Sequence, residues 1–319
     1  MDQQTAVREQ NHLSDTLTAR VKKLARDWRM DLVGIADPER YHSAPRMLRP
    51  EALLPGARAV VVIAIRYPYA MFDRAGKEPA SSMMALGQHQ NETIGYMLNR
   101  AALKISRLLE DEGHEAVAIP VSGSWRVHPY KDIPSAWCAN FSHRHAAAAA
   151  GLGELGLHSL LISPEFGVRQ RFDTIITDAP LAPDPMYSGP PLCDMCMACV
   201  EACPLGAIDP DNLESCTIGD RTFKYAKVDH WRCAWSEQVN LVAQEGPEYF
   251  GQEFTEMPPE DAEVNDENLL AALHRKWESA GIEAGSHVMG ACMRVCVPPH
   301  LRGWRAYPKE HLLAAPYVQ

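Results

Sequence analysis

A run of four cysteines closed by a proline constrains the second half of this sequence more than any other feature. Its spacing is C-x2-C-x2-C-x3-C-P, formed by Cys193, Cys196, Cys199, Cys203 and Pro204. Three thiolates two residues apart can wrap three corners of one iron–sulfur cubane, while the fourth cysteine reaches another cluster. Zinc is the alternative, but zinc usually takes cysteine pairs separated by a long spacer. The run therefore predicts 4Fe–4S chemistry of the bacterial ferredoxin type, and with it one-electron transfer.

The other cysteines of this half are scattered along the chain. The last two are spaced C-x3-C with Pro298 nearby, like the end of a second run, and Met289 stands where that run would place its preceding cysteine. Crossed ligation then predicts two sets of ligands. The first set is Cys193, Cys196, Cys199 and Cys296. The second set is Cys203, Cys216, Cys233 and Cys292. The alternative is one cluster and four free thiols, and the ninth cysteine, Cys138, receives no role.

Length and charge limit the classes of protein that remain. The chain has 319 residues, enough for roughly two domains, and no apolar run of the ~18 residues that span a bilayer. The first residues lack the basic and apolar segments of an export signal, so we expect a cytoplasmic protein without a membrane partner. The net charge of −10 comes entirely from the cysteine-rich half. This predicts no nucleic-acid partner, because phosphate binding needs a basic surface; the acidic excess is either a solvated face or a docking surface.

Apolar periodicity predicts an α+β fold in which helices alternate with short strands. A helix capped by Ser14 comes first. The expected strands are 31–36, 59–65, 115–121, 160–162 and 172–177. The expected helices are 91–112 and 143–150. The Pro-rich stretch 179–191 predicts a linker, and 244–267 predicts an acidic insertion. We therefore expect one domain over 1–185 and a second, containing the insertion, over 186–319.

Residues 151–156 spell G-x-G-x-x-G, which is also the pattern of a dinucleotide-binding loop. Such a loop follows a strand and opens a helix, whereas here a helix is expected before the glycines and a strand after them. A dinucleotide site is therefore not predicted. The glycines indicate instead a backbone that approaches something broad and flat.

Residues 141–181 carry a longer resemblance. An Ala-rich helix is followed by Gly151-Leu-Gly-Glu-Leu-Gly156, the turn Ser163-Pro-Glu-Phe-Gly167, the pair Arg169 and Arg171, and the step Thr177-Asp-Ala-Pro-Leu181. With the cysteine run behind it, this layout resembles the cobalamin-dependent reductive dehalogenases and, more distantly, epoxyqueuosine reductase. The resemblance implies a nitroreductase-like domain that holds base-off cobalamin, followed by a ferredoxin domain with two 4Fe–4S clusters.

The resemblance also implies roles for particular residues. Arg171 matches the position of a cation beside the proton donor, Asn140 lies near an active-site amide, and Tyr130 is the candidate donor, with His143 and His145 as alternatives. The residues expected to contact cobalamin are Gly151, Leu152, Gly153, Gly156, Leu157, His158 and Ser159.

Departures from both families bear on the substrate. The chain lacks the export signal of respiratory dehalogenases and the extra domains of catabolic ones. Glu154 and His158-Ser159 stand where epoxyqueuosine reductases usually have Trp and Lys-Asn. The catalytic aspartate of that family would fall near Trp137–Cys138, where this sequence has none. The first expectation is a dehalogenase-like reductase of a small organic substrate, fed by a ferredoxin, flavodoxin or flavin reductase. The alternatives are an epoxyqueuosine reductase-like enzyme and a non-catalytic electron carrier or corrinoid activator.

Overall fold

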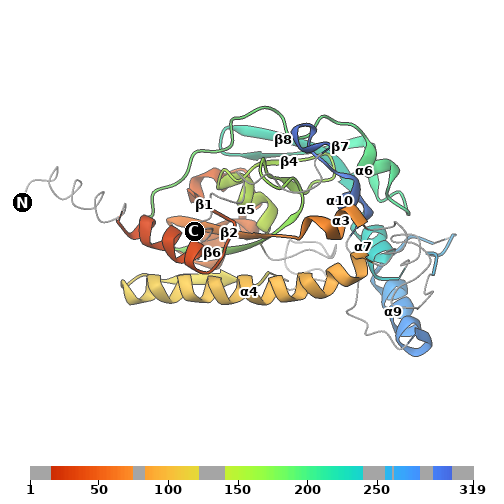
Figure 1. Ribbon diagram of the computed structural model, residues 1–319, viewed down its shortest axis with the longest axis horizontal. Helices are drawn as coiled ribbons and strands as arrows, with labels where there is room; N and C mark the ends of the chain where they lie inside the picture. The colour runs from red at the N-terminus through yellow and green to blue at the C-terminus, as the bar shows by residue number, and fades with distance from the viewer. Residues whose placement is uncertain are drawn as a thin grey trace, which may run out of the picture.

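A four-stranded antiparallel sheet lies at the centre of the first half of the chain (Figure 1). The computed structural model describes residues 16–74, 83–121, 141–239, 256–260, 262–280 and 290–303. In spatial order the strands are β1 (Leu32–Ala36), β2 (Ala59–Arg66), β6 (Gln170–Thr177) and β3 (Ala116–Ile119). The central strands β2 and β6 are buried except at Arg66 and Arg171. The continuous apolar sequence of β2 predicts its burial, whereas β6 also buries the polar residues Gln170, Asp173, Thr174 and Thr177.

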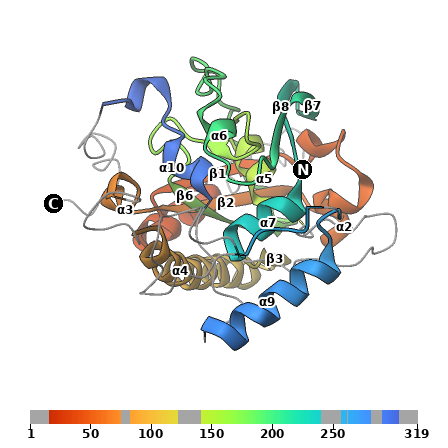
Figure 2. The same cartoon turned by 90° about the vertical axis from the view of Figure 1, so that its right-hand side faces the viewer.

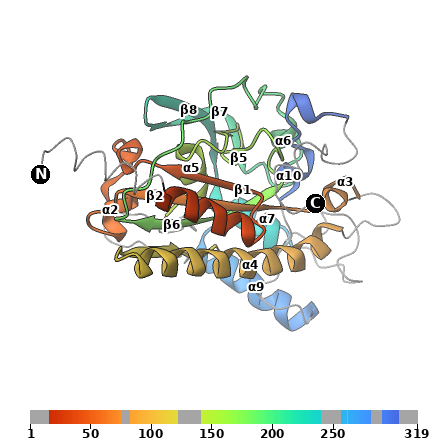
Figure 3. The same cartoon turned by 60° about the vertical axis from the view of Figure 1, so that its left-hand side comes forward.

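Helices cover both faces of this sheet, and successive residues of each strand alternate between the faces. Val61 and Ile63 pack with the helix over residues 16–27 and with α4 (Met83–Asp111). Val60 and Val62 pack on the other face against α5 (His143–Ala149). Figures 1 and 3 show α4 along one side of the sheet and α5 on the other. The alanines of α5 are fully buried, so their small side chains let the helix lie close to the strands.

The mixed helix-and-strand architecture and the expected strands are confirmed. The largest difference is the start of α4, which begins at Met83 rather than at residue 91. The segment after the glycines forms a small hairpin of β4 (Glu154–Leu155) and β5 (Leu161–Ile162). Short helices α2 (Pro50–Leu53) and α3 (Tyr69–Arg74) flank β2. The capping residue Ser14 and residues 244–255 of the expected insertion lie outside the described residues.

The second half is built from one hairpin and several helices. Strand β7 (Ile208–Ile218) pairs with β8 (Arg221–Val228). The helices are α6 (Ala198–Glu201), α7 (His230–Gln238), α9 (Asp266–Ala280) and α10 (Ala291–Val295). Helix α9 packs on α7 through Trp235, and α10 lies beside α6 (Figure 2). No helix in the described ranges is long and apolar enough to cross a bilayer.

The first part of the Pro-rich stretch, residues 179–184, packs on the α/β half, whereas residues 188–191 are exposed. Ala179 and Leu181 belong to the core beneath the sheet. The carboxylate of Asp184 accepts the backbone N–H of Ile35 at 2.9 Å and pairs with Lys22. Prolines leave few backbone donors to satisfy, and so an extended Pro-rich segment can lie against a surface with few hydrogen bonds. The division of the chain at residues 185 and 186 stays a prediction.

Candidate functional site

Four thiols from two separate segments line one pocket. They are the first predicted set: Cys193, Cys196, Cys199 and Cys296. The pocket lies where α6 meets α10. Burial and the neighbouring thiols raise the pKa of Cys199 to about 11 and that of Cys296 to about 12. Iron binds the thiolate, so loading a cluster would release these protons. The donor set and its arrangement fit a 4Fe–4S cluster.

The cysteine run curls because two of its residues adopt left-handed backbone conformations. Met195 has a φ of 56° and Met197 a φ of 64°, which is uncommon for residues other than glycine. Met197 also precedes α6 directly and accepts the N–H of Val200 at 2.9 Å. These turns direct the thiols of the run toward one side.

The opposite wall of this pocket comes from the α/β half. Leu157, His158 and Ile162 line it, and the N–H of Leu157 donates to the sulfur of Cys193 at 3.4 Å. Hydrogen bonds of this kind to cysteine sulfur are among the means by which proteins set cluster potentials. The pocket therefore touches the segment that the resemblance associates with a cofactor.

Glu154 fastens the cysteine run to this wall, a role that the sequence did not reveal. Its buried carboxylate accepts the N–H of Leu192 at 2.5 Å and that of Cys193 at 3.2 Å. Arg221 of β8 pairs with the same carboxylate at 3.4 Å. The sequence does show that Glu154 is an acidic residue inside a glycine-rich segment. Its hydrogen-bond partners Leu192 and Cys193, however, lie 38 and 39 residues further along the chain and are seen only in the structure.

The glycines that were expected to face a macrocycle face the chain itself. A Cβ on Gly151 would lie 2.1 Å from the carbonyl oxygen of Pro185, and one on Gly153 would lie 2.0 Å from that of Ile162. A Cβ on Gly156 would meet the side chain of Ile162 at 2.6 Å. Leu152 packs toward the α5 core. In the direction of a Cβ, these glycines therefore contact the chain itself, and the expected cobalamin contacts stay a prediction.

His158 and Ser159 end this segment in defined positions. Ser159 is held by the guanidinium of Arg144, which donates to its hydroxyl at 2.7 Å and to its carbonyl at 3.0 Å. The Nδ1 atom of His158 accepts the N–H of Leu160 at 3.1 Å, which places the ring proton on Nε2. That Nε2 is buried and has no hydrogen-bond partner among the described residues. Burial and Arg144 lower the pKa of His158 to about 4, so its ring is neutral.

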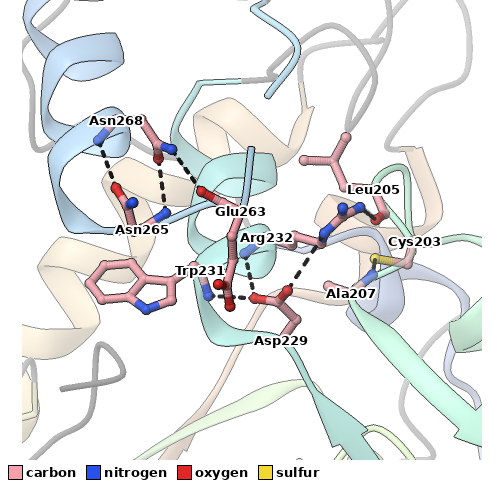
Figure 4. A network of polar contacts seen from close by, with 9 residues as sticks. All are labelled: Cys203, Leu205, Ala207, Asp229, Trp231, Arg232, Glu263, Asn265 and Asn268. Carbon is pink, nitrogen blue, oxygen red and sulfur yellow. Dashed lines mark hydrogen bonds and ion pairs between the residues drawn. The ribbon is translucent and has the colours of Figure 1, made fainter. Parts of the chain in front are cut away.

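A second group of thiols contains three of the four expected members. Burial is the main cause that raises the pKa of the Cys233 and Cys292 thiols; the charges of Glu237, Cys292 and Cys203 add to it at Cys233, and those of Glu237 and Cys203 at Cys292. Cys203 and Cys292 also pack against the same small core. The sulfur of Cys203 accepts the N–H of Ala207 at 3.2 Å (Figure 4). These residues come from the end of the run, from α7 and from α10. They form the floor of a second candidate cluster site.

The structure does not bring Cys216 to this group. It lies on β7 opposite Phe223 and packs on the α5 core. Burial raises the pKa of its thiol, and its hydrogen-bond partner is Tyr225. Among the residues that the structure describes, no three His, Cys, Asp or Glu side chains converge closely enough for a single metal ion. The four corners of a cubane stand apart, so cluster ligands need not converge in that way.

The expected catalytic residues are only partly placed. Tyr130, Asn140 and Cys138 lie outside the described residues. Arg171 pairs with Ile65 across the sheet, on the face that carries α4, and its guanidinium hydrogen-bonds Tyr67. The glycine segment packs with α5, and the charge of Arg171 reaches His143 at the start of that helix.

Three further titratable groups near β6 bear on proton transfer. Burial raises the pKa of Asp173 to about 7, a feature that the sequence did not suggest. His143 bonds Thr174 at 2.7 Å, and His145 bonds its own N-cap residue Ser142 at 2.6 Å. Burial lowers the pKa of both histidines to about 4. Both are therefore neutral and held in structural contacts, while Asp173 titrates near neutral pH.

Comparison with known proteins gives two kinds of relative, both reductases. No family model matches the chain. The epoxyqueuosine reductase of Gloeobacter violaceus is 32% identical over 176 residues, 55% of this chain and 49% of that protein. A tetrachloroethene reductive dehalogenase of Desulfitobacterium hafniense is 38% identical over 96 residues, 27% of this chain and 17% of that protein. The chain thus spans about half the length of the epoxyqueuosine reductases it matches.

Solved structures of both kinds also align with the chain. A catabolic reductive dehalogenase covers 74% of this chain, and the chain covers 32% of it, at 21% identity and a TM-score of 0.48. An epoxyqueuosine reductase bound to a modified tRNA-Tyr stem loop aligns over 88% of this chain and 79% of its own chain, at 17% identity and a TM-score of 0.46.

The expectation that the chain is closer to the dehalogenases is not confirmed, because its matches to epoxyqueuosine reductases are about twice as long.

Proposed function

We propose that this protein is an iron–sulfur reductase that works with a corrinoid, like the two kinds of enzyme to which it is related. One observation supports this best. The pocket lined by Cys193, Cys196, Cys199 and Cys296 is closed by Leu157 and His158 of the α/β half. A cluster held there would pass electrons directly into the half of the chain where substrate reduction is expected.

The residues of this chain supply the electron path. We propose that electrons arrive from a ferredoxin, flavodoxin or flavin reductase in the cytoplasm, reach the second cluster and pass to the first. Glu154 holds the run against the α/β half, and the N–H of Leu157 stabilises charge on Cys193. When bound, base-off cobalamin would supply the low-potential metal centre that reduces the substrate. Arg171 and Asp173 share one face of β6, and we propose that Arg171 orients the proton donor there.

The substrate that the relatives favour is the epoxide of a modified tRNA nucleoside. The longest sequence matches are to epoxyqueuosine reductases and cover 53–55% of this chain. A halogenated organic compound is the second candidate, because the shorter dehalogenase matches have the higher identity, 38–39%. The acidic second half would have to turn away from the RNA in the first case.

Anaerobic reconstitution tests the proposal. The iron-loaded protein is incubated with cobalamin, separated from free cofactor by gel filtration and examined by visible spectroscopy. We expect a corrinoid spectrum on the protein, and reduction of an epoxyqueuosine-containing stem loop or halide release from a halogenated phenol with a low-potential reductant. Cys199→Ser is the matched control, since it removes one ligand of the first cluster. Failure to retain cobalamin, together with fast electron transfer to another protein's corrinoid, would instead establish an electron carrier.

A further inference from the structure

Helix α7 presents two potential ligands on one face. Cys233 and Glu237 are four residues apart, so their side chains project from the same side of the helix. The start of α7 is fixed by Asp229, whose carboxylate accepts the N–H groups of Trp231 and Arg232 at 3.0 and 2.9 Å. Arg232 donates to the carbonyl of Leu205 at 3.3 Å, next to Cys203 (Figure 4). The helix is therefore held against the end of the cysteine run.

The carboxylate of Glu237 meets the beginning of α10. The N–H of Gly290 donates to it. A Cβ on Gly290 would lie 2.7 Å from the Oε1 atom of Glu237 and 3.3 Å from the sulfur of Cys292. One carboxylate oxygen and one thiol thus flank the same glycine. The charge of Glu237 also acts on both Cys233 and Cys292, so it lies near these two thiols.

A 4Fe–4S cluster at this position needs a fourth ligand. Cys216 packs in another core, and the chain has the uncharged thioether of Met289 where a second run would carry its cysteine. We propose that the carboxylate of Glu237 is the fourth ligand of the second cluster, beside Cys203, Cys233 and Cys292. This inference rests on the second cluster of the proposed function. The carboxylic acid would give up its proton to bind iron.

A carboxylate corner has a distinctive chemistry. Oxygen is a harder ligand than thiolate, which is preferred by iron–sulfur clusters, so the iron at Glu237 is the one held least tightly. One-electron oxidation by ferricyanide would release that iron as Fe²⁺ and leave a three-iron cluster. Added Fe²⁺ and a one-electron reductant would rebuild the four-iron form. The first cluster, with four thiolates, would resist the same treatment.

Iron analysis and electron paramagnetic resonance test the assignment on the full chain. Wild type should bind about eight irons and show a three-iron signal only after ferricyanide. Glu237→Gln keeps an acceptor for Gly290 but removes the charged ligand, so it should bind about seven irons and show that signal upon mild oxidation without iron release. Glu237→Cys should bind about eight irons and resist ferricyanide. Cys216→Ser, the control, should match wild type.

Each contrary result has a separate meaning. A Glu237→Gln protein with full iron content and wild-type behaviour would overturn the assignment. So would loss of the second cluster in Cys216→Ser. A wild-type protein that binds only about four irons would remove the second cluster itself, and the role of Glu237 with it, while leaving the first cluster of the proposed function intact. Retention of the first cluster's signal in every variant would show that each variant has folded.

Discussion

His158 should raise the reduction potential of the first cluster. His158 lines the pocket together with Cys193 and Cys296. Its Nε2 is buried and has no protein acceptor in the described part of the chain. Leaving a buried donor unsatisfied costs about 1–3 kcal/mol. A sulfide or thiolate of a bound cluster would satisfy it. Because a reduced cluster carries one more negative charge, the hydrogen bond would be stronger in the reduced state.

The size of the effect follows from the strength of such bonds. Hydrogen bonds to charged groups contribute about 1 kcal/mol more than those between neutral groups. A one-electron couple shifts by about 59 mV for each tenfold change in its equilibrium constant, which corresponds to about 1.4 kcal/mol. Replacing His158 by Phe keeps a planar ring and removes the donor. We therefore expect the potential of the first cluster to fall by about 40 mV.

A redox titration monitored by electron paramagnetic resonance measures this shift. Iron content and circular dichroism accompany it, because His158→Phe also removes the acceptor of the Leu160 N–H. The control is His42→Phe, which changes an exposed histidine on a short 3-10 turn far from the cysteines in sequence. An unchanged or raised potential in His158→Phe, at full iron content, would refute the hydrogen bond.

Three further predictions concern the clusters, turnover and pH. Cys203→Ser should reduce the signal of the second cluster and spare that of the first, as seen by spectroscopy of the reconstituted variant. Arg171→Ala should retain iron but lose most of its activity, and equal turnover would reject its role. Because burial raises the pKa of Asp173 to about 7, the folded protein keeps a proton that the unfolded chain releases near pH 4. Stability should therefore fall as pH rises from about 4 to about 7, and urea unfolding should show that Asp173→Asn removes this slope.

The apolar strands could be predicted from the sequence, while the start of α4 could not. Strand β2 is apolar up to Arg66 at its end, and short apolar segments bounded by turns favour strands. Strand β6 has a weaker signal, since Phe172, Ile175 and Ile176 are its only apolar residues. Residues 88–91, Gln-His-Gln-Asn, carry no apolar side chain to continue the repeat that Ile94 begins. The composition of a Pro-rich segment likewise does not reveal whether it is exposed or packed on the protein. Here the contacts of Asp184 show that its part of the segment is packed.

The candidate ligands show a similar limit. Spacing alone grouped Cys193, Cys196 and Cys199 with Cys296, and the structure places these four around one pocket. Counting cysteines also predicted Cys216 for the second set, because a pattern of thiols cannot reveal a carboxylate in the same role. The position of Glu237 depends on α7 facing α10, which is a tertiary contact between segments more than 50 residues apart in the sequence.

The glycine segment connects the two halves through its shape rather than through a ligand. Gly151 lets the backbone pass Pro185, and Gly153 lets it pass Ile162, each at a distance that no Cβ would allow. Between them and the pocket, Glu154 accepts the N–H groups that begin the cysteine run. A larger residue at Gly153 would push Glu154 away from Cys193 and so move the first ligand of the cluster. We therefore expect such a variant to lose iron, and with it electron transfer. Binding of a cofactor by the α/β half should be affected less, because Glu154 positions the thiols.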